Sequence, residues 1–295
     1  MSCGQLSSFA GGKINLRLKV TGKRQDGYHE LDTIFYPFAF PADKITIDSV
    51  TLRGTELVCH QYIPGESSRN LALLAAQRYA AETGIAAHWR ITLEKILPIA
   101  AGFGGGSSDA AAVLKMLNDH FQLLDDSRLA EIALSLGADV PFFLKNSPVR
   151  ATGIGEVFEN FVLPEKMPEL LLVYPGFPVS AKWAYQNLAP EHIGGGITVT
   201  PADYMSAFSD PGNADWDELV RNDLAFALWE KFPVLRLLKR FILEHGAWCV
   251  QISGSGSGMF ALFGDPDAAG ECAGALRKSV YGNPYTRIFT KGKEW

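Results

Sequence analysis

A run of glycines near the middle of the chain limits what it can fold into more than any other feature. Four of the five residues 102–106 are glycine, and Ser107-Ser108-Asp109 follows. The run lies between a predicted strand, Trp89–Glu94, and a predicted helix with apolar residues at 110, 114, 117 and 121. Glycine permits positive φ angles and a close approach of backbone N–H groups to a ligand. Because a helix N-terminus also attracts anions, the segment predicts a phosphate-binding loop.

The competing interpretation of this loop is a flexible turn in which Ser107 or Ser108 caps the helix. Four glycines exceed what a cap needs, so phosphate binding is favoured. The loop is not a Walker A motif, since no Gly-Lys-Ser/Thr follows, and Ser107 stands where a dinucleotide fingerprint needs its third glycine. Asp109 is expected in the first helical turn, where it either complements the helix dipole or helps to place Mg²⁺.

A second glycine run, Ser253–Gly258, alternates serine and glycine between predicted strands at 250–253 and 259–263. Taken alone it is equally typical of a hairpin connection. The sequence contains no Gly-X-Ser-X-Gly nucleophile elbow, and its six histidines form no close pair with metal-ligand spacing. Serine hydrolases and zinc enzymes are therefore not indicated.

Strands and helices alternate irregularly along the chain, which predicts an α+β fold rather than a doubly wound parallel sheet. The remaining predicted strands cover residues 13–20, 31–40, 44–47, 52–59 and 170–174. The remaining predicted helices cover residues 70–83 and 232–244, while residues 186–220, rich in Gly, Pro, Asn and Asp, are expected to be loop with short helix. A chain of 295 residues fits two medium domains. We place the boundary near residue 160, which gives domains 1–160 and 161–295.

Bulk composition argues against several classes of protein. The net charge of −5 offers no electrostatic case for binding a nucleic acid or a membrane, and the basic residues Arg287, Lys291 and Lys293 are expected to be a solvated tail. Four well-separated cysteines suit a reducing compartment. Neither a signal-peptide pattern nor an apolar run of transmembrane length is present, so the expectation is a soluble, cytoplasmic protein.

The two glycine runs together resemble the motifs of the GHMP kinases, the family of galactokinase, homoserine kinase, mevalonate kinase and phosphomevalonate kinase. The segment from Leu97-Pro98 to Ala110-Ala111 resembles the ATP loop of that family, and Ile252–Ser257 resembles its C-terminal glycine motif. One branch of the family matches further segments in order: 13–16, 27–31, 136–142, 153–156, 175–176 and 222–224. The chain departs from the usual pattern at Gly11-Gly12, at Phe103 and over 186–220, which leaves the far substrate wall undefined.

The resemblance implies a two-domain fold, with an N-terminal domain like the second domain of ribosomal protein S5 and a ferredoxin-like C-terminal domain. It also implies a reaction in which ATP, with Mg²⁺, phosphorylates the 2-hydroxyl of a methylerythritol that carries a cytidine diphosphate group, in the non-mevalonate route to isoprenoid precursors. The implied ATP loop comprises Pro98, Ile99, Ala100, Ala101, Gly102, Phe103, Gly104, Gly105, Gly106, Ser107 and Ser108. The protein ligands of Mg²⁺ and the oligomeric state stay open.

The resemblance also implies two catalytic residues. Asp139 would accept the proton of the attacking hydroxyl, as a base does in phosphoryl transfer. From the residues alone, Asp139 before Val140-Pro141 is instead a good helix N-cap with proline in the first turn. Lys13 is the implied partner that keeps the Asp139 carboxylate ionised, although alone it would be interpreted as a solvated lysine on an edge strand. Asn15 is implied to line the same wall.

Three aromatic residues, Tyr28, His29 and Tyr185, are implied to hold the cytosine of the substrate. A flat base with a mixed donor and acceptor edge suits stacking on an aromatic ring and a hydrogen bond from an imidazole. Without the resemblance, Tyr28-His29 flanks a turn and Tyr185 is a core residue. Two alternatives are a GHMP kinase for another alcohol, such as mevalonate or homoserine, and a catalytically silent relative that only binds ligands. The presence of both Lys13 and Asp139 argues against the silent relative.

Overall fold

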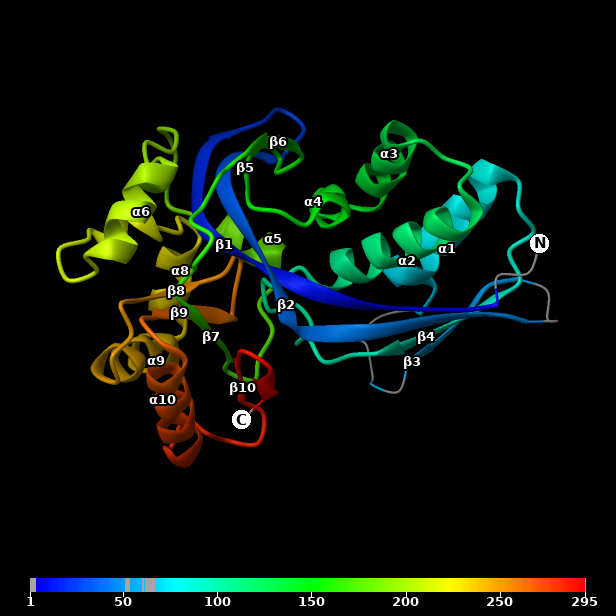
Figure 1. Cartoon of the computed structure of the whole chain (residues 1–295). Helices are drawn as coiled ribbons and strands as arrows, with labels where there is room; N and C mark the ends of the chain where they lie inside the picture. The colour runs from blue at the N-terminus through cyan, green and yellow to red at the C-terminus, as the bar shows by residue number, and fades with distance from the viewer. Residues whose placement is uncertain (1–3, 51–53, 60, 62–66, 295) are drawn as a thin grey trace. The chain divides into compact units, whose positions relative to one another are not determined.

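A computed structural model describes residues 4–50, 54–59, 61 and 67–294, and strands and helices mix along the whole chain (Figure 1). The strands are β1 (Gln5–Lys23), β2 (His29–Ser49), β3 (Glu56–Cys59), β4 (Trp89–Glu94), β5 (Val149–Gly153), β6 (Val157–Asn160), β7 (Glu169–Tyr174), β8 (Cys249–Ile252), β9 (Met259–Phe263), β10 (Arg287–Thr290) and β11 (Lys293–Glu294). The helices are η1 (Ser67–Arg69), α1 (Leu71–Thr83), α2 (Gly105–Phe121), α3 (Asp126–Leu136), α4 (Val140–Lys145), α5 (Ala181–Gln186), η2 (Pro190–His192), α6 (Pro201–Ser209), α7 (Trp216–Leu219), α8 (Ala225–Lys231), α9 (Pro233–Glu244) and α10 (Pro266–Lys278). The α+β class is confirmed.

The chain forms two compact units. The first unit contains the described residues up to Gly12 together with Ala42–Ile99 and Gly104–Ser147. The second contains Lys13–Pro41, Ala100–Phe103 and the chain from Pro148 onward. The units are not consecutive halves of the sequence, because the long strands β1 and β2 supply residues to both. The division into domains 1–160 and 161–295 stays a prediction.

In the first unit, helices α1 and α2 lie over one face of a small sheet (Figure 1). Strand β4 pairs antiparallel with the second half of β2, with Ile47 opposite Ile91, and parallel with β3. Apolar residues alternate along β4, so that one face of the strand is buried. Helix α1 begins at Leu71 because the side chain of Asn70 accepts a hydrogen bond from the N–H of Ala72. The loop at residues 95–104 connects β4 to the N-terminus of α2.

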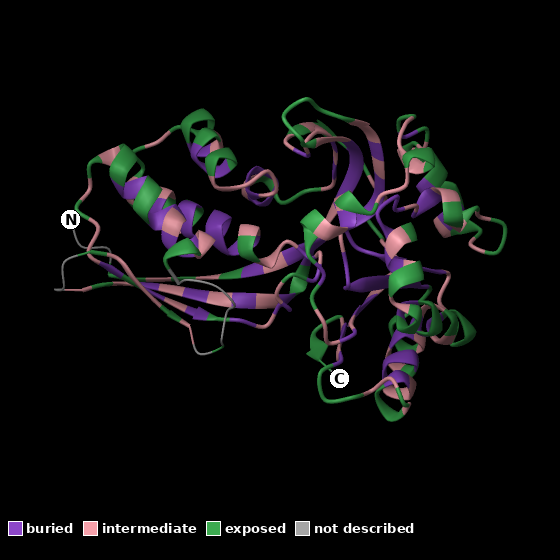
Figure 2. Ribbon diagram, turned by 180° about the vertical axis from the view of Figure 1, so that it is seen from behind, coloured by how far each residue is buried: buried purple, intermediate pink, exposed green. Residues whose placement is uncertain are grey.

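The second unit contains a five-stranded antiparallel sheet in the order β11-β10-β7-β9-β8. Strands β8 and β9 are buried along their whole length (Figure 2). Helix α10 connects β9 to β10, and helices lie between β7 and β8 in the sequence. The strand order β10-β7-β9-β8 with these connections is the ferredoxin-like arrangement. The first half of β2 pairs with β5, and β5 pairs with β6.

Several expected elements are confirmed, and the division of residues 31–47 into two strands is wrong. The strand at Trp89–Glu94 and the helix after the glycine run are present, and α1 and α9 lie within a residue of their expected bounds. Residues 31–40 and 44–47 are not separate strands. They belong to one strand, β2, because its two halves pair with different partners, β5 and β4. Leu52 and Arg53, which belong to the expected strand 52–59, lie outside the described residues.

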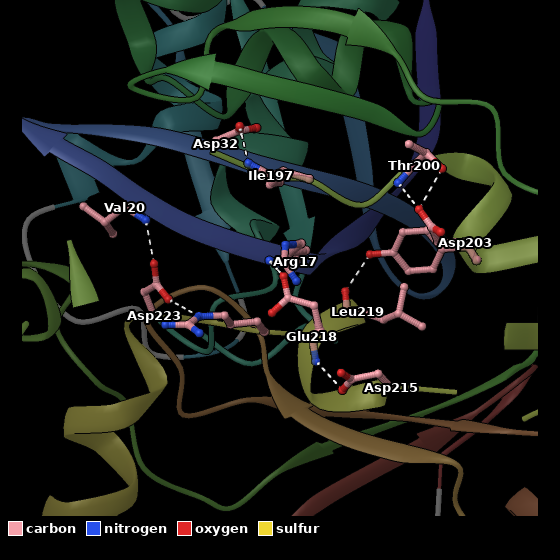
Figure 3. Close-up of polar contacts among 12 residues, drawn as sticks. Arg17, Val20, Asp32, Ile197, Thr200, Asp203, Asp215, Glu218, Leu219 and Asp223 are labelled. Carbon is pink, nitrogen blue, oxygen red and sulfur yellow. Dashed lines mark hydrogen bonds and ion pairs between the residues drawn. The ribbon is translucent and has the colours of Figure 1, made fainter. Parts of the chain in front are cut away.

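Residues 186–220 form loop with the short helices η2, α6 and α7, as expected. Helix α6 begins after Thr200, and the Asp203 carboxylate accepts a hydrogen bond from the Thr200 N–H at 2.7 Å, as in a capping box (Figure 3). The Thr-Pro-Ala-Asp sequence at 200–203 was a usable signal for this helix. Among the residues that the structure describes, none of the helices combines the length and apolar character that crossing a bilayer requires.

Candidate functional site

The glycine run turns sharply and then starts a helix. Gly102 and Gly104 have φ angles of 80° and 71°, a region that residues with side chains rarely adopt. Helix α2 begins at Gly105, with Gly104 in the N-cap position and no side chain capping it. The interpretation of Ser107 or Ser108 as the cap is therefore wrong, since both lie inside the first turn. The free N–H groups of this turn are the feature that suits an anion.

The second glycine run packs against residues 100–103 within the second unit. The Gly258 N–H donates to the Ala101 carbonyl at 3.0 Å, and the Ser253 hydroxyl donates to the Gly102 carbonyl at 2.9 Å. A Cβ at Gly102 would lie 2.0 Å from the Ser253 carbonyl oxygen, so only glycine fits there. The run is thus more than a hairpin connection, because it holds the start of the candidate loop.

Lys13 and Asn15 lie on β1 beside the same two segments. The Lys13 side chain is 5% exposed, so the interpretation as a solvated lysine is wrong. Its backbone N–H donates to the Phe103 carbonyl at 2.9 Å, and its Nζ donates to Asn15 Oδ1 at 2.6 Å. The Asn15 N–H in turn donates to the Ser253 hydroxyl at 3.2 Å. The second unit therefore brings Lys13, Asn15, residues 100–103 and Ser253 together.

Asn222 organises the second glycine run, a role that the sequence did not reveal. Its side-chain Nδ2 donates to the carbonyls of Ile252 and Gly254, both at 2.8 Å, and its Oδ1 accepts from the Leu224 N–H. The residue is buried. The only signal was its place in the segment Asn222-Asp223-Leu224 that matches the family, because contacts over such sequence separations leave no local pattern.

Replacing Asn222 with alanine should lower the free energy of unfolding by about 2–4 kcal/mol, because two buried carbonyls lose their donor. Urea denaturation measures this loss. Asn213→Ala is the matched control, since Asn213 is exposed and bonds only at the surface, and it should change stability by less than about 0.5 kcal/mol. Equal losses in the two variants would remove Asn222 from this role.

In the first unit, the turn 104–108 lies against a buried charged cluster. A Cβ at Gly105 would lie 3.2 Å from Lys95 Nζ. That ammonium contacts the carboxylates of Asp43 and Asp109, the latter at 2.8 Å. Asp109 thus lies after the first turn of α2 rather than in it, and its partner is Lys95. The sequence did not identify Lys95 or Asp43, although Lys95 stands only two residues before Leu97.

Asp139 occupies the N-cap position of α4, which packs against α2 within the first unit. Its side chain makes no capping hydrogen bond, and its backbone angles, φ −80° and ψ −15°, are helical rather than extended. The interpretation of this residue as a capping side chain is therefore wrong.

Two of the three aromatic residues expected to hold the base meet in the second unit. The rings of His29 and Tyr185 stack with centroids 5.0 Å apart and planes 20° from parallel. Burial and the nearby Lys23 hold the pKa of His29 below its usual value, which favours the neutral imidazole. Tyr185 is half-buried at the edge of the core rather than inside it. Tyr28 is 60% exposed.

Residues 186–223 are tied to β1 and β2 by polar contacts (Figure 3). The buried Arg17 guanidinium contacts Glu218 at 2.5 Å, the Ile197 N–H donates to the Asp32 carboxylate at 2.8 Å, and the Val20 N–H donates to the Asp223 carboxylate at 3.0 Å. The contacts of Arg17 and Val20 hold β1, the strand that carries Lys13 and Asn15, and the contact of Asp32 holds β2. Within the described ranges, no group of three or more His, Cys, Asp or Glu side chains is arranged to hold a metal ion.

Comparison with known proteins decides the family. The model of the GHMP kinase N-terminal domain matches residues 70–147, and that of the GHMP kinase C-terminal domain matches residues 213–282. A 4-diphosphocytidyl-2-C-methyl-D-erythritol kinase of Bacteroides thetaiotaomicron is 37% identical over 260 residues, which cover 87% of this chain and 91% of that protein. The chain belongs to the GHMP kinase family. GHMP kinases use ATP as their phosphate donor.

Further relatives of this GHMP kinase agree with that assignment. A protein of the same name from Geobacter sp. (strain M21) is 38% identical over 281 residues, which cover 93% of this chain and 95% of that protein. A crystal structure of a 4-(cytidine 5'-diphospho)-2C-methyl-D-erythritol kinase superposes with a TM-score of 0.80 and 34% identity, and covers 97% of this chain and 98% of that one. The two-domain GHMP kinase fold is thereby confirmed.

Proposed function

We propose that this GHMP kinase transfers the terminal phosphate of ATP to the 2-hydroxyl of 4-diphosphocytidyl-2-C-methyl-D-erythritol, in the non-mevalonate route to isoprenoid precursors. The observation that carries the proposal is the identity of 37–38% over 87–93% of the chain to kinases named for this substrate. Kinases for mevalonate or homoserine and a silent binding protein are not favoured by these relatives.

The proposed triphosphate site is the loop from Pro98 to Ser108. Positive φ angles at Gly102 and Gly104 turn the backbone in a way that suits close approach of a ligand, and the first turn of α2 adds its own unpaired N–H groups and the positive end of its dipole. Ala100, with φ 53°, adds a third position of this kind. These features suit a ligand with several negative oxygens, which supports ATP as the donor bound here.

Asp139 and Lys13 are the proposed catalytic residues. Phosphoryl transfer asks a protein mainly to position the reactants and to stabilise charge. Asp139 accepts the proton of the attacking hydroxyl, and its place at the start of α4, the helix that packs against α2, supports this use. Lys13 supplies a buried positive charge that stabilises the reacting groups, and the Asn15 amide holds its ammonium at 2.6 Å. Asn15 lines the same wall for the substrate.

Mg²⁺ belongs to the proposal as the ion that accompanies ATP, where it neutralises the phosphate oxygens. The side chains described here do not build a dedicated site for it. The Asp109 carboxylate, which the sequence offered as a ligand, is buried and bonded to Lys95. The phosphate oxygens of the nucleotide would therefore be the main ligands of Mg²⁺.

His29, Tyr185 and Tyr28 are proposed to bind the cytosine. The stacked pair of His29 and Tyr185 offers an aromatic face and an imidazole whose neutral form is favoured. A neutral imidazole carries one donor and one acceptor nitrogen, which suits the edge of cytosine. Tyr28, which precedes His29 in the sequence, is exposed and adds a third ring.

Replacing Tyr185 with alanine should raise KM for the cytidylyl substrate by about 10–100-fold and leave KM for ATP unchanged, since one stacked base contributes roughly 1–3 kcal/mol. Steady-state kinetics with each substrate varied in turn measures both constants. Tyr285→Ala is the matched control, because Tyr285 is 75% exposed, and it should change neither. Parallel losses for both substrates would point to a folding defect and remove Tyr185 from the base site.

A substrate panel tests the proposed function directly. ADP release is followed with ATP and, in turn, the cytidylyl alcohol, mevalonate, homoserine or no acceptor. We expect release only with the cytidylyl alcohol. ADP release with mevalonate or homoserine instead would show that this alcohol is the substrate. No ADP release in any of the four mixtures would indicate a protein that binds ligands without catalysis.

A further inference from the structure

A buried cluster of three charged side chains lies directly beneath the turn that starts α2. Asp43, Lys95 and Asp109 are each at most 5% exposed. The Lys95 ammonium contacts both carboxylates and lies 3.2 Å from where a Cβ of Gly105 would stand. Asp43 lies in β2, Lys95 directly after β4, and Asp109 in α2, all within the first unit.

The two carboxyl groups of this cluster have very different surroundings. Asp43 Oδ1 accepts the N–H groups of Ile96 and Leu97, at 2.5 and 2.8 Å, and its Oδ2 contacts Lys95. Asp109 Oδ2 accepts from Lys95, its carboxyl group also lies beside that of Asp43, and its Oδ1 is buried without a hydrogen-bond partner among the described residues. Hydrogen bonds from N–H groups stabilise a charged carboxylate. The Asp43 carboxyl therefore accepts from three donors and the Asp109 carboxyl from one, so a proton is held more readily on Asp109.

The protonation state of Asp109 sets the net charge beneath the anion site. With both carboxylates ionised, one ammonium faces two negative charges, and the buried cluster carries a net negative charge beneath the N-terminus of α2. A negative charge there repels the phosphate oxygens that the turn attracts. Side chains of a helix lean toward its N-terminus, so the Asp109 carboxyl leans toward the first turn rather than away from it.

We propose that the Asp109 carboxyl is the proton-linked element of the nucleotide site: it takes up a proton when an anion binds at the turn 104–108. The proposal rests on the proposed function for the identity of the anion, a nucleotide. Proton uptake removes the net negative charge of the cluster and leaves the Lys95–Asp43 pair neutral. Asp109 is thus a positioning residue, which acts on the ligand through Lys95 and the turn rather than by contact with the reacting atoms.

The pKa of the Asp109 carboxyl is consistent with proton uptake near neutral pH. Burial raises the pKa of Asp109 to about 7, with Lys95 opposing and Asp43 adding to the rise. Burial lowers the pKa of Lys95, but Asp109 and Asp43 outweigh that effect and raise it overall, so Lys95 stays charged. Among the described residues, Lys95 and Asp43 are the charged groups that act on Asp109. The helices packed on α2, which are α1, α3 and α4, add none.

The sign of the pH dependence follows from the raised pKa. A bound anion is a nearby negative charge, so it raises the pKa of Asp109 further, by about one unit or more. Nucleotide affinity is then constant below the pKa of the free protein, falls as pH rises between the free and bound values, and becomes constant again above both. At pH 7.5, about half a proton should be taken up by Asp109 for each nucleotide bound.

Calorimetry of ADP binding tests the proposal. The observed enthalpy is measured at pH 7.5 in buffers of different ionisation enthalpy, and the slope gives the protons taken up. The wild-type slope should exceed that of Asp109→Asn by about half a proton, since asparagine keeps the shape and cannot titrate. Asp119→Asn, on the exposed end of the same helix, should match the wild type.

Equal slopes for wild type and Asp109→Asn would overturn the proposal while leaving the proposed function intact, because ADP would still bind. If the wild-type protein gave no binding heat with ADP in any buffer, both this proposal and the proposed function would be contradicted. Should Asp109→Asn not fold, carbon-13 NMR of wild-type protein labelled at aspartate carboxyl groups gives the answer. One carboxyl should titrate near pH 7 and move upward with ADP, and finding none that titrates above pH 5 would overturn the proposal.

Discussion

Asp139→Asn lowers kcat by about 10²–10⁴, the usual contribution of a general base, which corresponds to roughly 3–5 kcal/mol of activation free energy. Asparagine has the same shape as aspartate but cannot accept the proton of the attacking hydroxyl. The KM values for ATP and for the alcohol should change little, because the substitution removes an interaction made in the transition state. Steady-state kinetics with both substrates near saturation measures the effect.

Asp126→Asn is the matched control for this prediction, because Asp126 is exposed at the start of α3. It should leave kcat unchanged. Circular dichroism and thermal unfolding establish that Asp139→Asn is folded. A folded Asp139→Asn enzyme with wild-type kcat would exclude Asp139 as the base.

Gly105→Val weakens nucleotide binding by at least about 100-fold, or roughly 2.7 kcal/mol. A Cβ at this position would lie 3.2 Å from Leu97 Cβ and 3.2 Å from Lys95 Nζ, which is already tight, and valine adds two methyl groups. The turn has to shift, so its N–H groups no longer converge on one anion. Fluorescence or calorimetric titration with ADP measures the loss.

Gly212→Val serves as the comparison for Gly105→Val. No heavy atom lies within 4 Å of a Cβ at Gly212, and its φ is not in the left-handed region, so valine fits without strain. Its affinity for ADP should equal that of the wild type. If the folded Gly105→Val protein bound ADP normally, the triphosphate would have to bind elsewhere.

Local patterns predicted the parts of the fold that are set within about twenty residues. The strand at 89–94, the turn of glycines and the helix after it carry their signals in consecutive positions, namely alternation, positive-φ residues and an apolar stripe. Strand β2 was divided wrongly, because Pro41 and Asp43 favour a turn locally. The pairing of its two halves with β5 and β4 keeps the chain extended, and such pairings are not visible in a sequence window.

The candidate site also contains residues that the sequence predicted and residues that it did not. The glycine loop was apparent from composition, whereas Asn222, Lys95 and Asp43 were not, because their partners lie far away in the sequence. Asn222 contacts carbonyls at 252 and 254, and Asp43 contacts residues 95–97. The roles of Lys13, Asp139 and the base-binding aromatics came from family resemblance and stay proposals. Burial overturned the local interpretation of Lys13, and the starts of α2 and α4 overturned the first-turn placement of Asp109 and the capping interpretations of Ser107, Ser108 and Asp139.

The position of the new phosphate in the product tests the central claim most directly. Carbon 2 of a 2-C-methyl-erythritol that bears a hydroxyl carries no hydrogen, whereas carbons 1 and 3 do. After incubation with ATP and the cytidylyl alcohol, proton-coupled phosphorus-31 NMR should show a new phosphomonoester signal without coupling to a proton on the esterified carbon. A doublet or triplet would place the phosphate on another hydroxyl, and no new phosphomonoester at all would contradict the proposed reaction.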